Sequence, residues 1–416
     1  MRSRIWWYIF LFSLIMATGI GIWSLEVRFS EGLITSNLSN IVPWGLWVSL
    51  YIFFIGLSAG SFLISTLVYV FEIKKYERAG RLAVYQAFIC LCIGLFFVLL
   101  DLGHPERFYQ VFLTPNTSSI LTYEIFAYLF YIVILVAELY FLMRKDLASI
   151  SSDKPDIMGA FYRCCTLGYR DASNESLTKD MKIVKILAII GLPVAIIVHG
   201  GTGAIFSVVK ARPYWYTALF PIVFIISALV SGGGALTFVT GFLSRQKDIG
   251  HKNMVKSLAR LTAGILCIDL VLMGIEVLVG LYGQIPDHLV TYNLIMKGPF
   301  WWVFWFMQLL IGVAIPLPLI FNKWTGNSLK WLGISGALIV FGIVGVRLNI
   351  IIPPLINPLL PGLTDAYHST RNIAYYFPSL NECLTSMGVI ALGIWGFLFG
   401  YKLLPLEEHK GISSVQ

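Results

Sequence analysis

The chain has 416 residues, of which 57% are hydrophobic and only 12% are charged, and its formal net charge is +8. Its mean hydropathy is +0.79. A soluble domain carries about twice this share of charged residues, so the composition excludes an ordinary water-soluble protein.

Apolar segments long enough to cross a bilayer recur along the whole chain, since a spanning helix needs about 20 such residues. They cover 5–26, 44–72, 82–101, 121–143, 183–209, 214–244, 257–282, 299–321, 329–352 and 384–404. Each must be helical, because only a helix satisfies its own backbone polar groups in lipid. We therefore expect an all-α polytopic membrane protein with about ten spans.

The first apolar segment could be mistaken for a signal peptide, because Arg2 and Arg4 precede it. It continues past Ile22 without a clear small-residue cleavage site, which favours a retained first span.

The positive charge is distributed unevenly between the two sides of the membrane. With the N-terminus placed in the cytoplasm, 23 of the 30 Lys and Arg residues fall on inside segments, six fall outside and Arg347 lies within a span. This bias predicts cytoplasmic N- and C-termini. The same bias accounts for the positive net charge, so nucleic-acid binding is not needed to explain it.

The cysteines and loops indicate no metal site. Cys164 and Cys165 are adjacent in the long inside loop 144–182, but no second pair completes a zinc or Fe–S site.

The outside segments 102–120, 283–298 and 353–382 are rich in aromatic, proline and acidic residues. Such a surface suits docking of another protein of a complex, although proline-rich connections also occur without a partner.

Ionisable residues in the spans carry most of the functional information, because they are costly in lipid. The polar residues in or beside the spans are Asp101, His104, Glu124, His199, Asp269, Glu276, Arg347 and Asn349. The topology places all of them in the outer third or at the outer surface, except Asp269, which lies nearer the midplane. A polar site near the outer face follows.

Each of these residues also has a purely structural interpretation. Asp101 and Glu106 could be surface residues or pair with Arg107, and Glu276 could neutralise Arg347 as a buried pair. A lone histidine such as His199 could simply donate to a backbone carbonyl.

The histidine count argues against haem. Bis-histidine haem b needs two histidines at matching depth on spanning helices. Of the six histidines, only His199 is well inside a span; the others are His104, His251, His288, His368 and His409. We expect no haem, no metal and no other redox centre in this chain.

A faint internal repeat links the second and sixth apolar segments. Trp44–Trp47 precedes the small-residue stripe Gly56–Gly60, and Pro213–Trp215 precedes Ser231–Gly234. Stripes of this kind pack membrane helices closely. The repeat predicts two four-helix bundles in the same orientation, together with two peripheral helices.

At these residues the chain resembles the NrfD/PsrC family, the integral membrane subunits of polysulfide reductase and related complexes. The matching segments are Trp44–Trp47 (WGLW) with Gly56–Gly60 (GLSAG), Leu100–Arg107 (LDLGHPER), His199–Gly203 (HGGTG) and Lys210–Trp215 (KARPYW). The length and the ten spans look like the longer branch, which includes menaquinone reductase, hydrogenase, Hmc- and Dsr-type and alternative complex III subunits. Where short members have a tyrosine beside the Thr-Gly of the fifth span, this chain has His199.

The resemblance implies a quinone site, usually for menaquinone, near the outer face of the prokaryotic cytoplasmic membrane. It also implies an outer-face Fe–S subunit that exchanges electrons with the quinone, accompanied by a molybdopterin or multihaem cytochrome subunit. The corresponding division of the chain is 1–40 (first span and outer loop), 41–210 (first bundle, with the quinone site), 211–352 (second bundle) and 353–416 (outer loop, last span and tail).

The residues then take the following expected roles. His199, Thr202, Gly203, Trp44 and Trp47 contact the quinone, and His199 can both donate a hydrogen bond and titrate.

The acidic residues are expected to move protons. Asp101, His104 and Glu124 connect the quinone with outside water, while Asp269, Glu276 and Arg347 form a proton path in the second bundle. A secondary transporter with a midplane polar site and a purely structural membrane anchor are the competing interpretations.

Overall fold

The computed structural model describes residues 2–153, 157–171, 173–244, 246–360, 362, 366, 369 and 371–407. His368 and His409, which enter the histidine count, lie outside the described residues.

The prediction of an all-α protein with ten spans is confirmed. The spanning helices are α1 (Arg2–Glu31), α2 (Leu46–Tyr69), α3 (Glu77–Asp101), α5 (Ile120–Asp153), α7 (Asn174–Ser207), α8 (Phe220–Phe242), α9 (Ile249–Tyr282), η4 (Val303–Ala314) continued by α11 (Pro316–Phe321), α12 (Leu329–Ile356) and α14 (Leu380–Leu403). The shorter elements are η1 (Gly32–Thr35), η2 (Lys74–Tyr76), η3 (Pro105–Arg107), α4 (Gln110–Leu113), α6 (Ile157–Cys165), α10 (Pro286–Met296) and η5 (Thr325–Asn327).

Three helices extend about eight residues or more beyond the apolar segments that predicted them. α5 continues to Asp153, while α7 and α9 begin at Asn174 and Ile249. Hydropathy marks only the part of a helix that lies in lipid, and polar contacts support the remainder. Arg144 of α5 pairs with Asp180 of α7, and Ser173 caps the first turn of α7.

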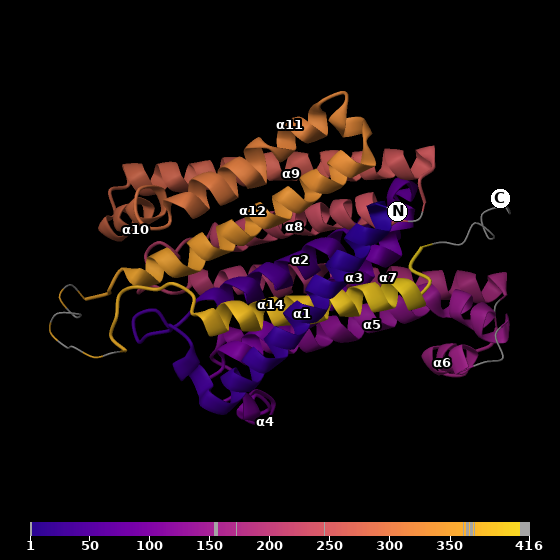
Figure 1. Cartoon of the computed structure of the whole chain (residues 1–416), viewed down its shortest axis with the longest axis horizontal. Coiled ribbons are helices and arrows are strands. Elements are labelled where there is room, and N and C mark those ends of the chain that lie inside the picture. The colour runs from indigo at the N-terminus through magenta and orange to yellow at the C-terminus, as the bar shows by residue number, and fades with distance from the viewer. Residues whose placement is uncertain are drawn as a thin grey trace.

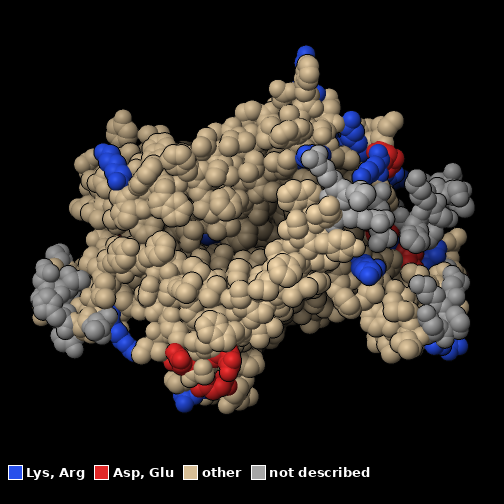
Figure 2. All heavy atoms as spheres, in the orientation of Figure 1, with Lys and Arg blue, Asp and Glu red and all other residues tan. Residues whose placement is uncertain are grey.

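The start of α1 and the end of α14 lie at the same end of the molecule, which we call the terminal end (Figure 1). α10 lies at the other end, which we call the opposite end. Figure 2 shows most of the visible Lys, Arg, Asp and Glu near the ends of the helices, with a nearly uncharged surface between them. On this face the uncharged surface is hollowed between α12 and α14.

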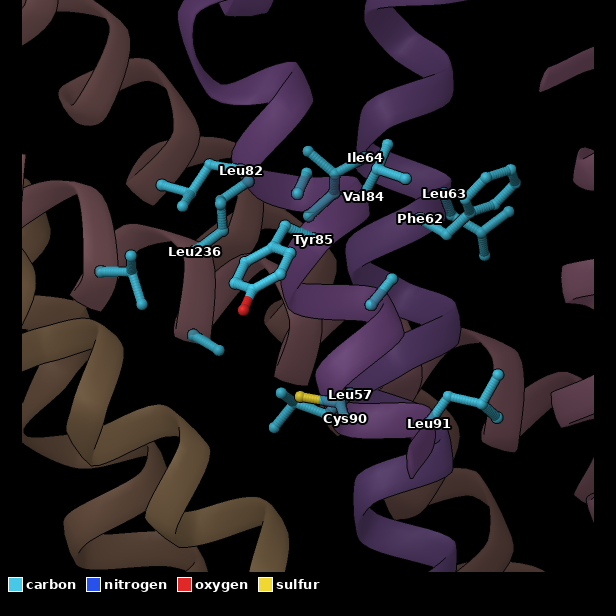
Figure 3. Packing of buried hydrophobic residues seen from close by; sticks show 14 of the residues in the cluster. Leu57, Phe62, Leu63, Ile64, Leu82, Val84, Tyr85, Cys90, Leu91 and Leu236 are labelled. Atoms are coloured by element: carbon cyan, nitrogen blue, oxygen red, sulfur yellow. The ribbon is translucent and has the colours of Figure 1, made fainter. Parts of the chain in front are cut away.

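The helices pack in three groups. α2, α3, α5 and α7 pack together as the first helix group, and α8, α9, η4 with α11, and α12 pack together as the second helix group. α1 packs mainly against α14, and α14 packs against α3. The two larger groups join through α2, which lies against α7, α8 and α12. Figure 3 shows part of the shared core, in which Leu57 of α2, Leu91 of α3 and Leu236 of α8 are buried. The division of the chain by residue number remains a prediction.

The two small-residue stripes of the repeat pack against each other. A Cβ on Gly60 would overlap the Ala228 carbonyl, and a Cβ on Gly232 would overlap the backbone of Gly60 and Ser61. Backbone contact of this kind gains van der Waals energy that larger side chains would prevent. The α2–α8 crossing therefore depends on glycine on both sides.

Gly232→Val should lower the stability of the protein by about 1–3 kcal/mol, because the added methyl groups must push α2 and α8 apart. Gly264→Val on α9 is the matched control, since nothing lies within 4 Å of its Cβ position. Melting temperatures of the two purified variants in detergent measure the difference. Equal melting temperatures would show that the crossing tolerates side chains.

Candidate functional site

His199 lies where α2, α7, α8 and α12 meet. Its side chain on α7 is 1% exposed, and a Cβ on Gly56 of α2 would come within 2.9 Å of the imidazole. Nη2 of Arg347 lies 3.4 Å from Nε2 of His199 and donates to Ser227 Oγ at 2.5 Å. The guanidinium also lies 4.6 Å from the centre of the Phe224 ring.

This contact assigns the tautomer of His199. A guanidinium is always protonated and only donates, so the Nε2 that faces it must be the acceptor. The ring proton then belongs on Nδ1, by assignment from hydrogen bonding. Among the described residues Nδ1 has no partner within hydrogen-bond distance, although the Phe224 backbone is near. Nε and Nη1 of Arg347 are likewise buried without a partner there.

A hydrogen-bonded cluster lies one helical turn away, around Glu124 of α5. Tyr128 donates to the carboxyl group at 2.6 Å, and Thr202 of α7 also donates to it. The Tyr128 hydroxyl lies 2.7 Å from that of Tyr51 on α2. We call these four residues the Glu124 cluster. The second oxygen of Glu124 is buried and has no partner in the described part of the chain.

Sequence reasoning found Glu124 and Thr202 but missed the two tyrosines. Tyr128 was detectable, because it follows Glu124 by four positions and so lies on the same helical face. Tyr51 had no such signal, since it reaches Tyr128 only because α2 and α5 both pack against α7.

Asp101 belongs to a different group from Glu124. Its nearest opposite charge is Arg28 of α1, and Glu382 of α14 is also close enough to interact. Arg28, which the topology assigned to an outside segment, is 1% exposed and lies over the Trp47 ring. It donates to the Leu100 and Leu102 carbonyls at 2.7–3.0 Å, which satisfies the end of α3.

The same group ties α14 to the start of α2. Tyr376 donates to Glu382 at 2.5 Å and accepts from the Leu46 amide at 2.8 Å. Burial, with a further contribution from the Glu382 carboxyl, raises the pKa of the Tyr376 hydroxyl. The charges that interact with Asp101 are thus on α1 and α14, and Oδ1 of Asp101 is buried without a hydrogen-bond partner among the described residues.

The segment after Asp101 is exposed. His104 contacts Glu106 at 2.9 Å, and Glu106 lies 3.9 Å from Arg107. No hydrogen bond within the described ranges joins His104 to Glu124. The expected pairing of Arg107 is therefore with Glu106, whereas Asp101 faces Arg28.

The two tryptophans of the WGLW motif point to different neighbours. Trp47 is fully buried and donates to Thr385 of α14 at 3.1 Å. Trp44 stacks on Trp215, with ring centres 6.0 Å apart. Gly203 packs tightly, because a Cβ there would lie 2.8 Å from Cα of Pro221.

A cavity of about 60 Å³ lies in the second helix group, which is enough for a few water molecules. Its polar lining comprises Asp269 and Glu276 of α9, Gln308 of η4, Asn349 of α12, Tyr214 and Tyr292. Asn349 donates to Gln308 at 3.2 Å. Asp269, Glu276 and Asn349 each keep one buried oxygen without a partner among the described residues.

The charges around this cavity differ from the expected Glu276–Arg347 pair. No ion pair within 4 Å joins these two residues, and the carboxylate that interacts with Arg347 is Asp269. η4 is a π-helix, a form that is rare and often occurs at functional sites. The apolar pattern of 299–321 predicted a span but could not reveal its winding.

Comparison with known proteins identifies the family. The model of the family described as polysulphide reductase, NrfD, matches residues 35–358. A selenate reductase subunit of Mesobacillus selenatarsenatis is 41% identical over 94% of this chain and 92% of its own length. The Hdr-like menaquinol oxidoreductase integral membrane subunit of Archaeoglobus fulgidus is 30% identical over 96% and 93%. The menaquinone reductase integral membrane subunit of Nitratidesulfovibrio vulgaris is 24% identical over 97% and 92%. With matches that extend over nearly the full length of these relatives, the chain belongs to the NrfD family of polysulphide reductase-type membrane proteins.

Proposed function

We propose that this chain is the quinone-interacting membrane subunit of a respiratory oxidoreductase complex, with menaquinone as its bound substrate. Relatives named for menaquinol and menaquinone, and for reductase complexes, support the substrate and the setting. The observation that carries the proposal is the set of buried, partnerless polar atoms on His199, Arg347 and Glu124. Buried polar atoms normally find partners, so such a set is typical of a ligand site.

The residues fit the needs of a quinone. Quinone reduction takes up two electrons and two protons, so the site needs hydrogen-bond donors for the carbonyl oxygens and a group that transfers protons. His199 Nδ1 and the free guanidinium nitrogens of Arg347 are donors, and the Glu124 carboxyl can give or take a proton. Thr202 and Tyr128 hold Glu124 in place.

The remaining expected contacts have supporting roles in this proposal. Trp44 and Gly203 shape the wall of the proposed quinone site near the start of α8, and Trp47 orients α2 through its hydrogen bond to Thr385. The hollow between α12 and α14 offers a route for the substrate from lipid (Figure 2). In this proposal Asp101 and His104 do not exchange protons with Glu124 directly, because other groups lie between them.

The electron partner in this proposal is an Fe–S subunit at the opposite end of the molecule, with a molybdopterin or multihaem cytochrome subunit beyond it. The opposite end then faces outward from the prokaryotic cytoplasmic membrane, and the terminal end faces the cytoplasm. The distribution of Lys and Arg supports this orientation. Within the described residues no group of His, Cys, Asp and Glu is arranged to hold a metal ion.

His199→Ala should lower quinone-coupled turnover at least about 100-fold while the complex still assembles, because the donor to the quinone is lost. His251→Ala is the control. His251 is 2% exposed and binds the Thr240 carbonyl at 3.0 Å, away from the Glu124 cluster. Menaquinol kinetics of the purified complexes provide the measurement. Wild-type kinetics in the His199 variant would remove this residue from the site.

The cavity at Asp269 and Glu276 supports a second element of the proposal, a proton path in the second bundle. Asp269→Asn should reduce the number of protons moved per quinol, measured in liposomes that contain the complex. Glu175→Gln, which changes an exposed carboxylate, serves as the control. An unchanged stoichiometry would eliminate this path.

A structural role of Asp269 predicts a different pattern. If Asp269 only balances Arg347, then Asp269→Asn should lower the melting temperature, and adding Arg347→Gln should restore part of it, because a buried charge without its counter-charge is destabilising. Melting temperatures of both variants distinguish this pattern from a proton path, in which the single variant stays close to wild type in stability but loses protons.

A further inference from the structure

Glu138 is a buried carboxyl group that the sequence analysis did not single out. It lies on α5, its side chain is 0% exposed, and both of its oxygens are without a hydrogen-bond partner among the described residues. No Lys, Arg or His there forms an ion pair with it. An isolated carboxylate is very costly inside a membrane protein, so the form that this site accommodates is the neutral, protonated one.

Glu138 shares a helical face with the Glu124 cluster. Glu124, Tyr131 and Glu138 follow one another at intervals of seven positions, so they lie on one side of α5. With a rise of 1.5 Å per residue, Tyr131 lies about 10 Å from each carboxyl-bearing residue along the helix axis. The three side chains are buried in the first helix group.

Tyr131 connects the two levels. Its hydroxyl lies 3.4 Å from the Ser58 carbonyl of α2, and it is close enough to Glu138 and Cys90 to interact electrostatically. Ser58 in turn donates to the Ala87 carbonyl of α3 at 2.7 Å. The hydroxyl of Tyr131 therefore lies among polar groups between the Glu124 cluster and Glu138.

Gln86 of α3 lies at nearly the same depth as Glu138. Arg81 of α3 pairs with Asp146 of α5 at 2.5 Å, and the two helices are antiparallel. Counting from this pair, Gln86 is about 8 Å and Glu138 about 12 Å into the bundle, a difference of less than one helical turn. Gln86 donates to Ser61 at 2.7 Å, but its own carbonyl oxygen is buried without a partner in the described chain.

These buried polar groups lie at successive depths through the half of the first helix group that is between the Glu124 cluster and the terminal end. Beyond Glu138, toward the terminal end, lie two ion pairs, Arg144 with Asp180 of α7 and Asp146 with Arg81 of α3. Arg81 and Asp146 are 15% and 17% exposed. Asp101 interacts electrostatically with Arg28 and Glu382, His104 contacts Glu106, and neither makes a hydrogen bond to the Glu124 cluster within the described ranges.

We propose that Glu138 carries protons between the Glu124 cluster and the terminal end, so that quinone chemistry exchanges its protons with the cytoplasmic side. The proposal rests on the proposed function and on its orientation of the chain. When a quinol is oxidised, two electrons leave to the electron-transfer subunit and two protons leave the quinol oxygens. Glu124 accepts these protons one at a time, and each crosses the roughly 20 Å to Glu138 by way of Tyr131 and water molecules that enter between these groups. Glu138 then releases the proton toward Asp146. Quinone reduction uses the same route in reverse.

The test uses the whole complex in liposomes, with a pH-sensitive dye on one side and a soluble menaquinol analogue as substrate. The accessible electron-transfer subunit reports the orientation. In the wild type, the protons of quinol oxidation should appear on the side of the terminal end. Their appearance on the opposite side would overturn the proposal without any variant.

Glu138→Gln keeps the size and polarity of the side chain but cannot pass a proton. We expect quinol oxidation to fall about tenfold or more and proton release at the terminal end to fall with it, while bound menaquinone is retained. Glu138→Asp should recover part of both activities, and Glu175→Gln should behave as wild type. Unchanged turnover and proton release in Glu138→Gln would overturn the proposal.

Two further measurements separate the explanations. A merely structural Glu138 predicts a lower melting temperature for Glu138→Gln with unchanged turnover per folded complex, and that result also overturns the proposal. A failure of the proposed function is distinguishable, because the wild-type complex would then hold no menaquinone and would not oxidise the analogue.

Discussion

The close crossing of α2 and α8 determines the rest of the architecture. Because Gly60 and Gly232 lack side chains, the two backbones touch, and the helices of the first group meet those of the second along this line. α12 then lies against both α2 and α8. This arrangement carries Arg347 across the boundary between the two groups, to within 3.4 Å of His199. A wider crossing would separate the guanidinium from the imidazole.

The second constraint is the cost of polar atoms in lipid. Most of the buried polar groups have partners. Arg28 satisfies the end of α3, Tyr376 joins Glu382 to the start of α2, and Thr202 and Tyr128 donate to Glu124. Against this background, our proposals assign the quinone and its protons to four of the residues that keep partnerless buried atoms, His199, Arg347, Glu124 and Glu138. The cavity beside the π-helix adds a second such region.

The sequence predicted the number and order of the spans, because hydropathy depends only on composition within a window. It also predicted that the stripes Gly56–Gly60 and Ser231–Gly234 would pack helices closely, though not that they would pack against each other. The helix ends were less predictable, because α5, α7 and α9 continue beyond the apolar segments into the polar region, where ion pairs and caps stabilise them. Of the candidate site residues, Glu124 and Thr202 are joined directly, whereas Asp101 and Trp47 interact with residues of α1 and α14.

By itself, the sequence determined that the chain is a ten-span membrane protein, that its charged residues are few, and that only His199 of its six histidines lies well inside an apolar segment. These properties follow from residue types and their spacing. Only the tertiary structure decided which polar residues are neighbours: that Arg347 interacts with His199 and Asp269 and not with Glu276, that the buried Arg28 caps the end of α3, and that Glu138 has no partner among the described residues. The physical reason is that the helical repeat fixes which side chains share one face of a helix. Contacts between helices depend instead on how the helices cross, and residues distant in the sequence determine those crossings together.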